Sequence, residues 1–135
     1  MKKITPLITV DEIEPVIPFW TAVGLEVTVT VPHGEGLGFA MLNAGALELM
    51  YQSRASVEED LAKKADGHPG LAARIAEGQS TLFIEVESID ELLPRLGEVE
   101  VVVSRRRTFY GMDEIFVLAP CGTLVGFAAK VDPDA

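Results

Sequence analysis

Two carboxylates occupy positions from which they could contact a ligand. Glu48 stands between Leu47 and Leu49 in a predicted strand, so its side chain faces away from the core that the leucines enter. A carboxylate in an apolar cleft needs a cation, a hydrogen-bond donor or a proton. Glu48 is therefore the strongest candidate for ligand contact. The alternatives are an ion pair with one of the arginines 105–107 and simple exposure.

Glu114 is the second candidate, in the strand predicted from Met112 to Leu118. It either adds a negative group to a cleft or an interface, or pairs with an arginine of the preceding strand. Aromatic rings and thioethers suit the walls of an apolar ligand site, although each is also an ordinary core residue. The residues of this kind are Phe39, Met41, Met50, Phe109 and Tyr110.

The other reactive side chains are more typical of structural roles than of a functional site. The run Arg105–Arg107 ends a predicted strand, so its members alternate between faces and form a solvated edge. Cys121 lies in a predicted turn without a neighbouring histidine, and we expect it to be inert. His33 lies in a predicted turn and His68 in the central connection, so neither is on a cleft-lining strand. The sequence contains no phosphate-binding glycine loop, nucleophile elbow or dinucleotide fingerprint.

The charge composition of the chain limits the classes of partner that it can bind. The 135 residues include 11 basic and 21 acidic ones, a net charge of −10. Such a chain repels phosphate backbones and anionic lipids, so we expect no nucleic-acid or membrane partner. The same field attracts a cationic small molecule, although the charge also simply keeps a hydrophobic chain in solution.

The apolar content suggests burial against a second subunit. Hydrophobic residues make up 48% of the chain, and the mean hydropathy is +0.27. We therefore expect a homodimer. One cysteine excludes an internal disulfide, and no segment is typical of a signal peptide or a membrane span, so we expect a cytoplasmic protein.

The two halves of the sequence repeat one another at a constant separation of about half the chain. This spacing is too long for a solenoid and indicates an internal duplication. The residues Thr5, Ile8, Val10, Ile13 and Pro18 recur as Thr81, Ile84, Val86, Ile89 and Pro94.

The first copy, residues 3–52, predicts one strand, one helix and three further strands. Asp11 and Glu14 have the spacing of a capping box, and Pro18 makes the helix short or irregular. An apolar stripe faces the sheet: Ile13, Val16, Ile17 and Trp20. The predicted strands cover residues 3–10, 25–31, 37–42 and 46–52.

A polar connection follows over residues 53–79. We expect a helix over 56–65, with Ser56 and Glu59 as its capping box, and a short helical turn over 71–77. The second copy, residues 80–130, repeats the order, with Ser88 and Glu91 as its capping box. Its helix carries the stripe Ile89, Leu92, Leu93 and Leu96. Its strands are predicted over 81–86, 98–103, 112–118 and 123–129, and the run Val101–Val103 predicts burial on both sides.

We therefore expect an α+β fold within a single domain, residues 1–135. Two tandem β-α-β-β-β modules would each form a curved mixed sheet with its helix on the convex side. The concave faces would line a cleft.

Several motifs strengthen this prediction: Phe19-Trp20, Leu47-Glu48-Leu49, Tyr110 to Glu114, and Ala119-Pro120-Cys121-Gly122. With these motifs the chain resembles the vicinal oxygen chelate superfamily, which includes glyoxalases, bleomycin-resistance proteins and extradiol dioxygenases. The resemblance covers nearly the whole chain and implies the fold more than the function, because the superfamily contains lyases, epimerases, dioxygenases, thiol transferases and non-catalytic drug binders. The last turn departs from the usual Asp-Pro-Asp-Gly but keeps its Pro and Gly, so we expect an intact fold.

The resemblance also implies where a metal would bind. Metal-dependent members hold a divalent ion with up to four side chains from equivalent strands. Those positions fall here on Thr5, Glu48, Thr81 and about Gly126. A hydroxyl or a glycine does not replace imidazole, carboxylate or thiolate ligands. We therefore expect no metal and no other cofactor, unless His33 or His68 reaches the cleft.

The preferred hypothesis is a metal-free small-molecule-binding protein of the bleomycin-resistance type that sequesters a cationic or aromatic antibiotic and is not an enzyme. The alternative is a lyase, isomerase or dioxygenase of the superfamily with Glu48 as base or metal ligand. A third hypothesis is a structural or regulatory dimer without a ligand. The expected ligand-binding residues are Glu48, Met50, Phe39, Met41, Tyr110 and Glu114.

Overall fold

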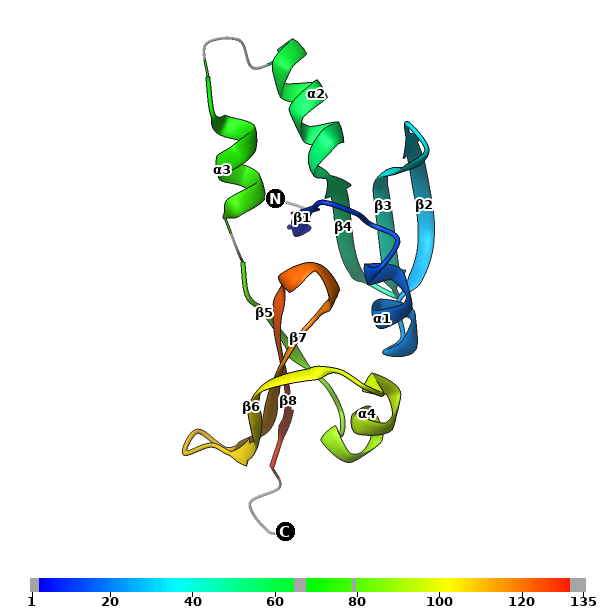
Figure 1. The fold of residues 1–135 in the computed structure, drawn as a ribbon. Coiled ribbons are helices and arrows are strands. Elements are labelled where there is room, and N and C mark those ends of the chain that lie inside the picture. Colours follow the sequence, from blue (N-terminus) through cyan, green and yellow to red (C-terminus); the bar gives the residue numbers. More distant parts are fainter. Residues whose placement is uncertain (1–2, 65–67, 79, 132–135) are drawn as a thin grey trace. The chain divides into compact units, whose positions relative to one another are not determined.

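Two four-stranded sheets, each accompanied by one helix of its own module, make up the fold (Figure 1). The computed structural model describes residues 3–64, 68–78 and 80–131. The chain divides into two compact units, Met1–Gln79 and Ser80–Ala135. Both units contain the order β-α-β-β-β, so the predicted α+β fold is confirmed. The expected single domain stays a prediction.

The first unit has a mixed sheet with the strand order β1-β4-β3-β2. The strand β1 pairs with β4 in parallel, and the other pairs are antiparallel. Two further helices follow the last strand. The elements are β1 (Leu7–Val10), α1 (Val16–Ala22), β2 (Glu26–His33), β3 (Gly36–Ala44), β4 (Leu47–Ser53), α2 (Arg54–Lys64) and α3 (Leu71–Glu77).

The core of the first unit lies between α1 and the sheet. Trp20 is buried, and its indole Nε1 donates a hydrogen bond of 2.8 Å to the hydroxyl of Tyr51 on β4. Because side chains alternate along a strand, Leu49 and Tyr51 face α1 while Glu48 and Met50 lie on the opposite face. The predicted burial of the α1 stripe is confirmed for Ile13, Val16 and Trp20, whereas Ile17 is half-buried.

The start of α1 differs from the predicted capping box. Pro15 occupies the N-cap position without a side-chain cap, so Asp11 does not cap the helix. Glu14 instead accepts a hydrogen bond of 2.6 Å from the backbone N–H of Leu37 on β3. Because α1 begins at Val16, Pro18 lies in its first turn, where the missing N–H costs no helical hydrogen bond.

The start of α2 also differs from the prediction. Ser53, and not Ser56, has the capping role, because its Oγ accepts a hydrogen bond of 3.2 Å from the N–H of Ser56. The helix consequently begins two residues before the predicted cap, at Arg54. The polarity of this segment did not distinguish between two serines so close together.

The second unit repeats the topology with the strand order β5-β8-β7-β6. Ser88 caps its helix by accepting a bond of 3.2 Å from the N–H of Glu91, as predicted. Gly97 ends the helix with a φ of 59°. The elements are β5 (Leu82–Glu85), α4 (Ile89–Leu96), β6 (Glu100–Arg107), β7 (Met112–Leu118) and β8 (Leu124–Lys130).

The predicted burial of the valine run on both sides is wrong. Val101, Val102 and Val103 are 47%, 52% and 36% exposed. They lie on β6, the edge strand of its sheet, which pairs only with β7. The helix α4 packs on β7 and β8, so β6 receives little cover from its own unit. The strand also continues through Arg107 and does not end at residue 103.

Candidate functional site

The carboxylate of Glu48 is the centre of a polar cluster in the first unit. Its Oε2 lies 2.6 Å from the Nζ of Lys3 and accepts a bond of 3.3 Å from the Nδ2 of Asn43. Its Oε1 accepts a bond of 2.9 Å from the Oγ1 of Thr5. The side chain of Glu48 is only 11% exposed, whereas that of Lys3 is 65% exposed.

Strand pairing builds this cluster. The hairpin register of β3 and β4 places Asn43 directly opposite Glu48. The parallel pairing of β1 with β4 brings the residues just before β1, Lys3 and Thr5, alongside the start of β4. The structure thus brings together two of the four predicted metal-ligand positions, Thr5 and Glu48.

These partners keep Glu48 ionised. The hydrogen bond from Lys3 is the largest cause of a lowered pKa of the Glu48 carboxyl, followed by the bond from Thr5. Desolvation opposes this effect, and Asn43 adds to it. The cation beside Glu48 is therefore the ammonium group of Lys3, and not one of the arginines considered from the sequence.

The apolar residues predicted for the first module share the face of Glu48. The register pairs Met41 with Met50 and Phe39 with Gln52, which places all four side chains on the sheet face opposite α1. Phe39, Met41 and Met50 are half-buried, whereas Ala40 and Leu42 on the other face have no exposure. These three therefore lie outside the core between α1 and the sheet.

The helix α2 borders this face. The Nε2 of Gln52 donates to the Oγ of Ser56 at 3.1 Å and to the Oδ2 of Asp60 at 3.0 Å, and both acceptors belong to α2. We call the sheet surface formed by Phe39, Met41, Glu48, Met50 and Gln52 the Glu48 face.

Glu114 is the centre of a second cluster, in the second unit. Its side chain has no exposure, its Oε1 accepts a bond of 2.9 Å from the Nη2 of Arg106, and its Oε2 accepts one of 2.7 Å from the hydroxyl of Tyr110. Pairing with an arginine of the preceding strand, one of the two alternatives for Glu114, is confirmed. The hydrogen bond to Glu114 is the largest cause of a raised pKa of Tyr110.

Arg105 points to the other face of β6, as the alternation predicts. Its Nε and Nη2 donate to the two carboxylate oxygens of Asp113 at 3.0 and 2.8 Å, and its Nη1 donates to Asp90 at 2.7 Å. The bonds from Arg105 lower the pKa of Asp113, and the two aspartates raise that of Arg105. The run lies on an exposed edge strand, as expected, and Arg105 and Arg106 in addition pair with specific carboxylates there.

Strand register moves the fourth predicted metal position. Phe83 pairs with Gly126 in the same way that Leu7 pairs with Met50. Gly126 is thus the counterpart of Met50, and the counterpart of Glu48 lies two residues earlier, at Leu124. The shift arose because the turns before β4 and β8 differ and the sequence alone does not fix the register.

The resulting donor set does not fit a transition metal. Of Thr5, Glu48, Thr81 and Leu124, only Glu48 carries a usual metal ligand. Within the described residues, no group of three or more His, Cys, Asp or Glu side chains is placed to hold an ion.

Neither histidine lies near the predicted metal-ligand positions of its own unit in sequence or strand pairing. The Nε2 of His33, at the end of β2, lies 2.5 Å from the Oε2 of Glu59 on α2. His68 is exposed in the segment before α3. His33 also lines a cavity of about 380 Å³ at the end of the first sheet, together with Asp11, Glu12, Glu14, Gly36, Leu37, Ser53 and Ala55.

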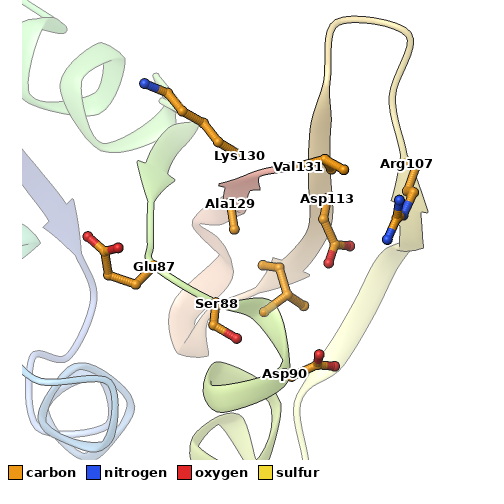
Figure 2. A pocket seen from close by; sticks show the side chains of 9 residues that line it. Glu87, Ser88, Asp90, Arg107, Asp113, Ala129, Lys130 and Val131 are labelled. Atoms are coloured by element: carbon orange, nitrogen blue, oxygen red, sulfur yellow. The ribbon is translucent and has the colours of Figure 1, made fainter. Parts of the chain in front are cut away.

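A smaller cavity of about 170 Å³ lies at the start of α4 (Figure 2). Asp113 of β7 and Arg107 of β6 border it on one side, and Ser88 and Asp90 border it at the helix. Arg105 already holds both of its aspartates. The two carboxylates that Asp90 and Asp113 contribute to the lining are therefore already paired.

Two residues of the Glu48 cluster were missed from the sequence. Asn43 was assigned to a turn, yet extending the hairpin pattern back from the turn at Gly45 would have placed it opposite Glu48. Lys3 had no signal of its own, because its contact with Glu48 depends on the parallel pairing of distant strands.

Comparisons with known proteins give similarity in structure only. No protein-family model matches the chain, and no curated protein sequence matches it either. Among solved structures, TioX from Micromonospora sp. ML1 is similar over 95% of this chain and 98% of its own, with a TM-score of 0.69 and 16% identity. The lactoylglutathione lyase of Agrobacterium tumefaciens is similar over 96% of this chain and 94% of its own, with a TM-score of 0.69 and 18% identity.

A bleomycin-binding protein in complex with bleomycin is similar over 96% of this chain and 99% of its own, with a TM-score of 0.59 and 15% identity. The chain has the glyoxalase/bleomycin resistance fold. The predicted resemblance is thereby confirmed at the level of the fold, which hosts both a lyase and a drug-binding protein. Fold alone therefore does not decide between binding and catalysis.

In the part of the chain that is described, no helix combines the length and apolarity needed to cross a membrane. The expected homodimer and cytoplasmic location stay predictions.

Proposed function

We propose that this chain is a small-molecule-binding protein that binds its ligand on the Glu48 face without a metal ion. The observation that carries the proposal is the set of donors around Glu48. A lysine, a threonine and an asparagine satisfy the carboxylate at the position where related enzymes would place a metal ligand. The similar bleomycin-binding protein gives this fold a precedent for drug binding.

The chemistry of the face favours a ligand that is partly aromatic and carries a cationic group. The half-buried Phe39, Met41 and Met50 offer an apolar and polarisable surface. A ligand ammonium group would take the place of the Lys3 ammonium at Glu48. Because the Lys3 side chain is mostly exposed, a ligand cation can displace its ammonium group without opening the fold.

Catalysis by Glu48 as a general base fits the cluster less well. A general base works best when its pKa lies near the working pH, whereas the bonds from Lys3 and Thr5 lower the pKa of Glu48. An enzyme of this fold would also need a second reactive group, and the described neighbours of Glu48 are a lysine that is already paired, a hydroxyl and an amide.

Calorimetry in the presence of excess chelator tests the proposal. The probes are bleomycin and ethidium, a planar aromatic cation. We expect saturable binding of at least one of them by the unmodified chain, weakened about tenfold or more by Glu48→Gln, which removes a charge-assisted contact. Glu35→Gln, the same change at an exposed position in the β2–β3 turn, should leave binding unchanged.

The Lys3→Met variant separates the ligand site from a purely structural ion pair. If a ligand cation replaces Lys3, this variant should bind the same probe at least as tightly. Failure of both probes to bind, or equal binding by the Glu48→Gln variant, would contradict the proposal.

A further inference from the structure

The guanidinium group of Arg106 is held by one buried carboxylate and keeps an open edge. Its Nη2 donates to Glu114, which has no exposure, while the Arg106 side chain is 56% exposed. A guanidinium group has five N–H donors in one plane. Among the residues that the structure describes, Nε and Nη1 of Arg106 have no hydrogen-bond partner.

The neighbouring Arg105 provides the contrast. All three of its side-chain nitrogens donate to Asp113 or Asp90. Arg105 is therefore committed to linking β6, β7 and the start of α4. Arg106 is the next residue and points to the other face of β6. It donates a single hydrogen bond, to Glu114, so its remaining N–H groups are available to a ligand.

The geometry of the group leaves a two-donor edge free. If Nη2 uses the hydrogen on the Nη1 side for Glu114, the Nε–Nη2 edge stays open. If it uses the other hydrogen, the Nη1–Nη2 edge stays open. In both cases, a planar carboxylate can accept two parallel hydrogen bonds from Arg106.

An aromatic surface lies beside this edge. Tyr110 donates to the second oxygen of the same carboxylate, so its phenol and the guanidinium group share one anchor. Tyr110 is 51% exposed and Phe109 is fully exposed, and their ring centroids lie 5.1 Å apart in an edge-to-face arrangement. Exposed neighbouring rings of this kind offer a planar ligand a surface for stacking.

Glu114 is a buried charge that accepts hydrogen bonds from both of these side chains. An apolar residue would fill a buried strand position without the cost of desolvating a charge. The carboxylate fixes the orientation of Arg106 and Tyr110 at once, and a pre-oriented guanidinium loses less entropy when it binds a ligand.

We propose that Arg106 binds the carboxylate of an aromatic acid, that Glu114 positions it, and that Tyr110 packs against the ring of the acid. This inference goes beyond the proposed function, because it assigns a different ligand group to different residues. It depends only on contacts within the second unit, so it and the proposal for the Glu48 face can fail separately.

Benzoate is the probe that tests this assignment, with benzyl alcohol as its uncharged counterpart. We expect calorimetry to show saturable benzoate binding and no binding of benzyl alcohol. In proton–nitrogen NMR spectra, the Nε–H signal of Arg106 should move with benzoate, while that of Arg105 should stay in place.

The decisive variants keep Glu114 paired. Arg106→Lys retains a cation for Glu114 but lacks the planar fork, and it should weaken benzoate binding about tenfold or more. Arg107→Gln, which removes an exposed charge from the same strand, should bind benzoate as the unmodified chain does. Thermal unfolding monitored by circular dichroism will show whether Arg106→Lys is folded.

The role of the ring has a separate readout. Tyr110→Leu should weaken the binding of benzoate by a larger factor than that of acetate, which has no ring to pack against. Absence of saturable benzoate binding, or benzoate binding that Arg106→Lys does not change, would overturn the assignment. Binding of ethidium or bleomycin that depends on Glu48 but not on Arg106 would leave the proposed function intact in that case.

Discussion

The Nζ of Lys3 lies 2.6 Å from the Oε2 of Glu48, although the two residues are 45 positions apart in the chain. The ammonium group thus neutralises Glu48, the one carboxylate among the four positions at which the sequence resemblance predicts metal ligands. Because a charge from the protein's own side chain stands beside Glu48, the carboxylate needs no metal ion to balance it.

Replacement of Lys3 should change the titration of Glu48. In Lys3→Met, we expect the pKa of Glu48 to rise toward 4.5, because Lys3 is the largest cause of its lowering. Some lowering should remain, since Thr5 and Asn43 still donate. Carbon-detected NMR of the Glu48 carboxyl measures this directly, with Lys130→Met as a control for loss of one exposed positive charge. An unchanged titration curve would show that Lys3 does not pair with Glu48 in solution.

Acid should destabilise the protein through a few identifiable carboxylates. The pKa values of Glu14, Glu48 and Asp113 are lowered in the folded chain, from ordinary values of 4.5, 4.5 and 3.8. A lowered folded pKa gives stability that is present above the ordinary pKa and is lost as the pH falls through the folded pKa. The free energy of unfolding in urea should therefore decrease as the pH is reduced below about 4.5.

The Asp113→Asn variant separates one contribution to this pH dependence. We expect it to be less stable at neutral pH and to lose less stability on acidification, because its amide does not titrate. A variant with the same acid dependence as the unmodified chain would exclude Asp113 as one of the groups.

Removal of the Tyr51 hydroxyl should destabilise the first unit. In Tyr51→Phe, the buried indole N–H of Trp20 loses its acceptor, and an unsatisfied buried donor costs about 1–3 kcal/mol. Urea unfolding followed by Trp20 fluorescence will measure the loss. A change of less than about 0.5 kcal/mol would mean that the hydrogen bond makes no net contribution.

A methyl group at Gly126 should strain the second sheet. A Cβ at this position would lie 2.5 Å from a ring carbon of Phe116, closer than van der Waals contact allows. We expect Gly126→Ala to cost about 1–3 kcal/mol, typical of overpacking. A double-mutant cycle with Phe116→Leu should recover part of the loss, whereas strict additivity would place the strain elsewhere.

The fold was predictable because its signals are local and occur twice. Helical spacing identified the buried Ile13 and Trp20, and one capping pair, Ser88 and Glu91, was enough to locate α4. The capping box predicted for α1 was wrong because a distant group competes for its glutamate. The carboxylate of Glu14 serves the backbone of Leu37, a partner that no local pattern reveals.

The candidate site was predictable only in part, for a related reason. Strand alternation placed Glu48 away from α1, but the donors that surround it depend on the pairing of β1 with β4 and on the hairpin register. A run of valines reads the same in a central strand and in an edge strand, so the exposure of Val101–Val103 required the strand order. Register likewise decided that Leu124, and not Gly126, is the counterpart of Glu48.

Elemental analysis of protein purified without chelator tests the central claim most directly. With Lys3, Thr5 and Asn43 satisfying Glu48, the account predicts far less than one equivalent of zinc, nickel, iron or manganese per chain, and no difference in metal content between the unmodified chain and Glu48→Ala. A full equivalent of one of these metals, lost in the Glu48→Ala variant, would contradict it.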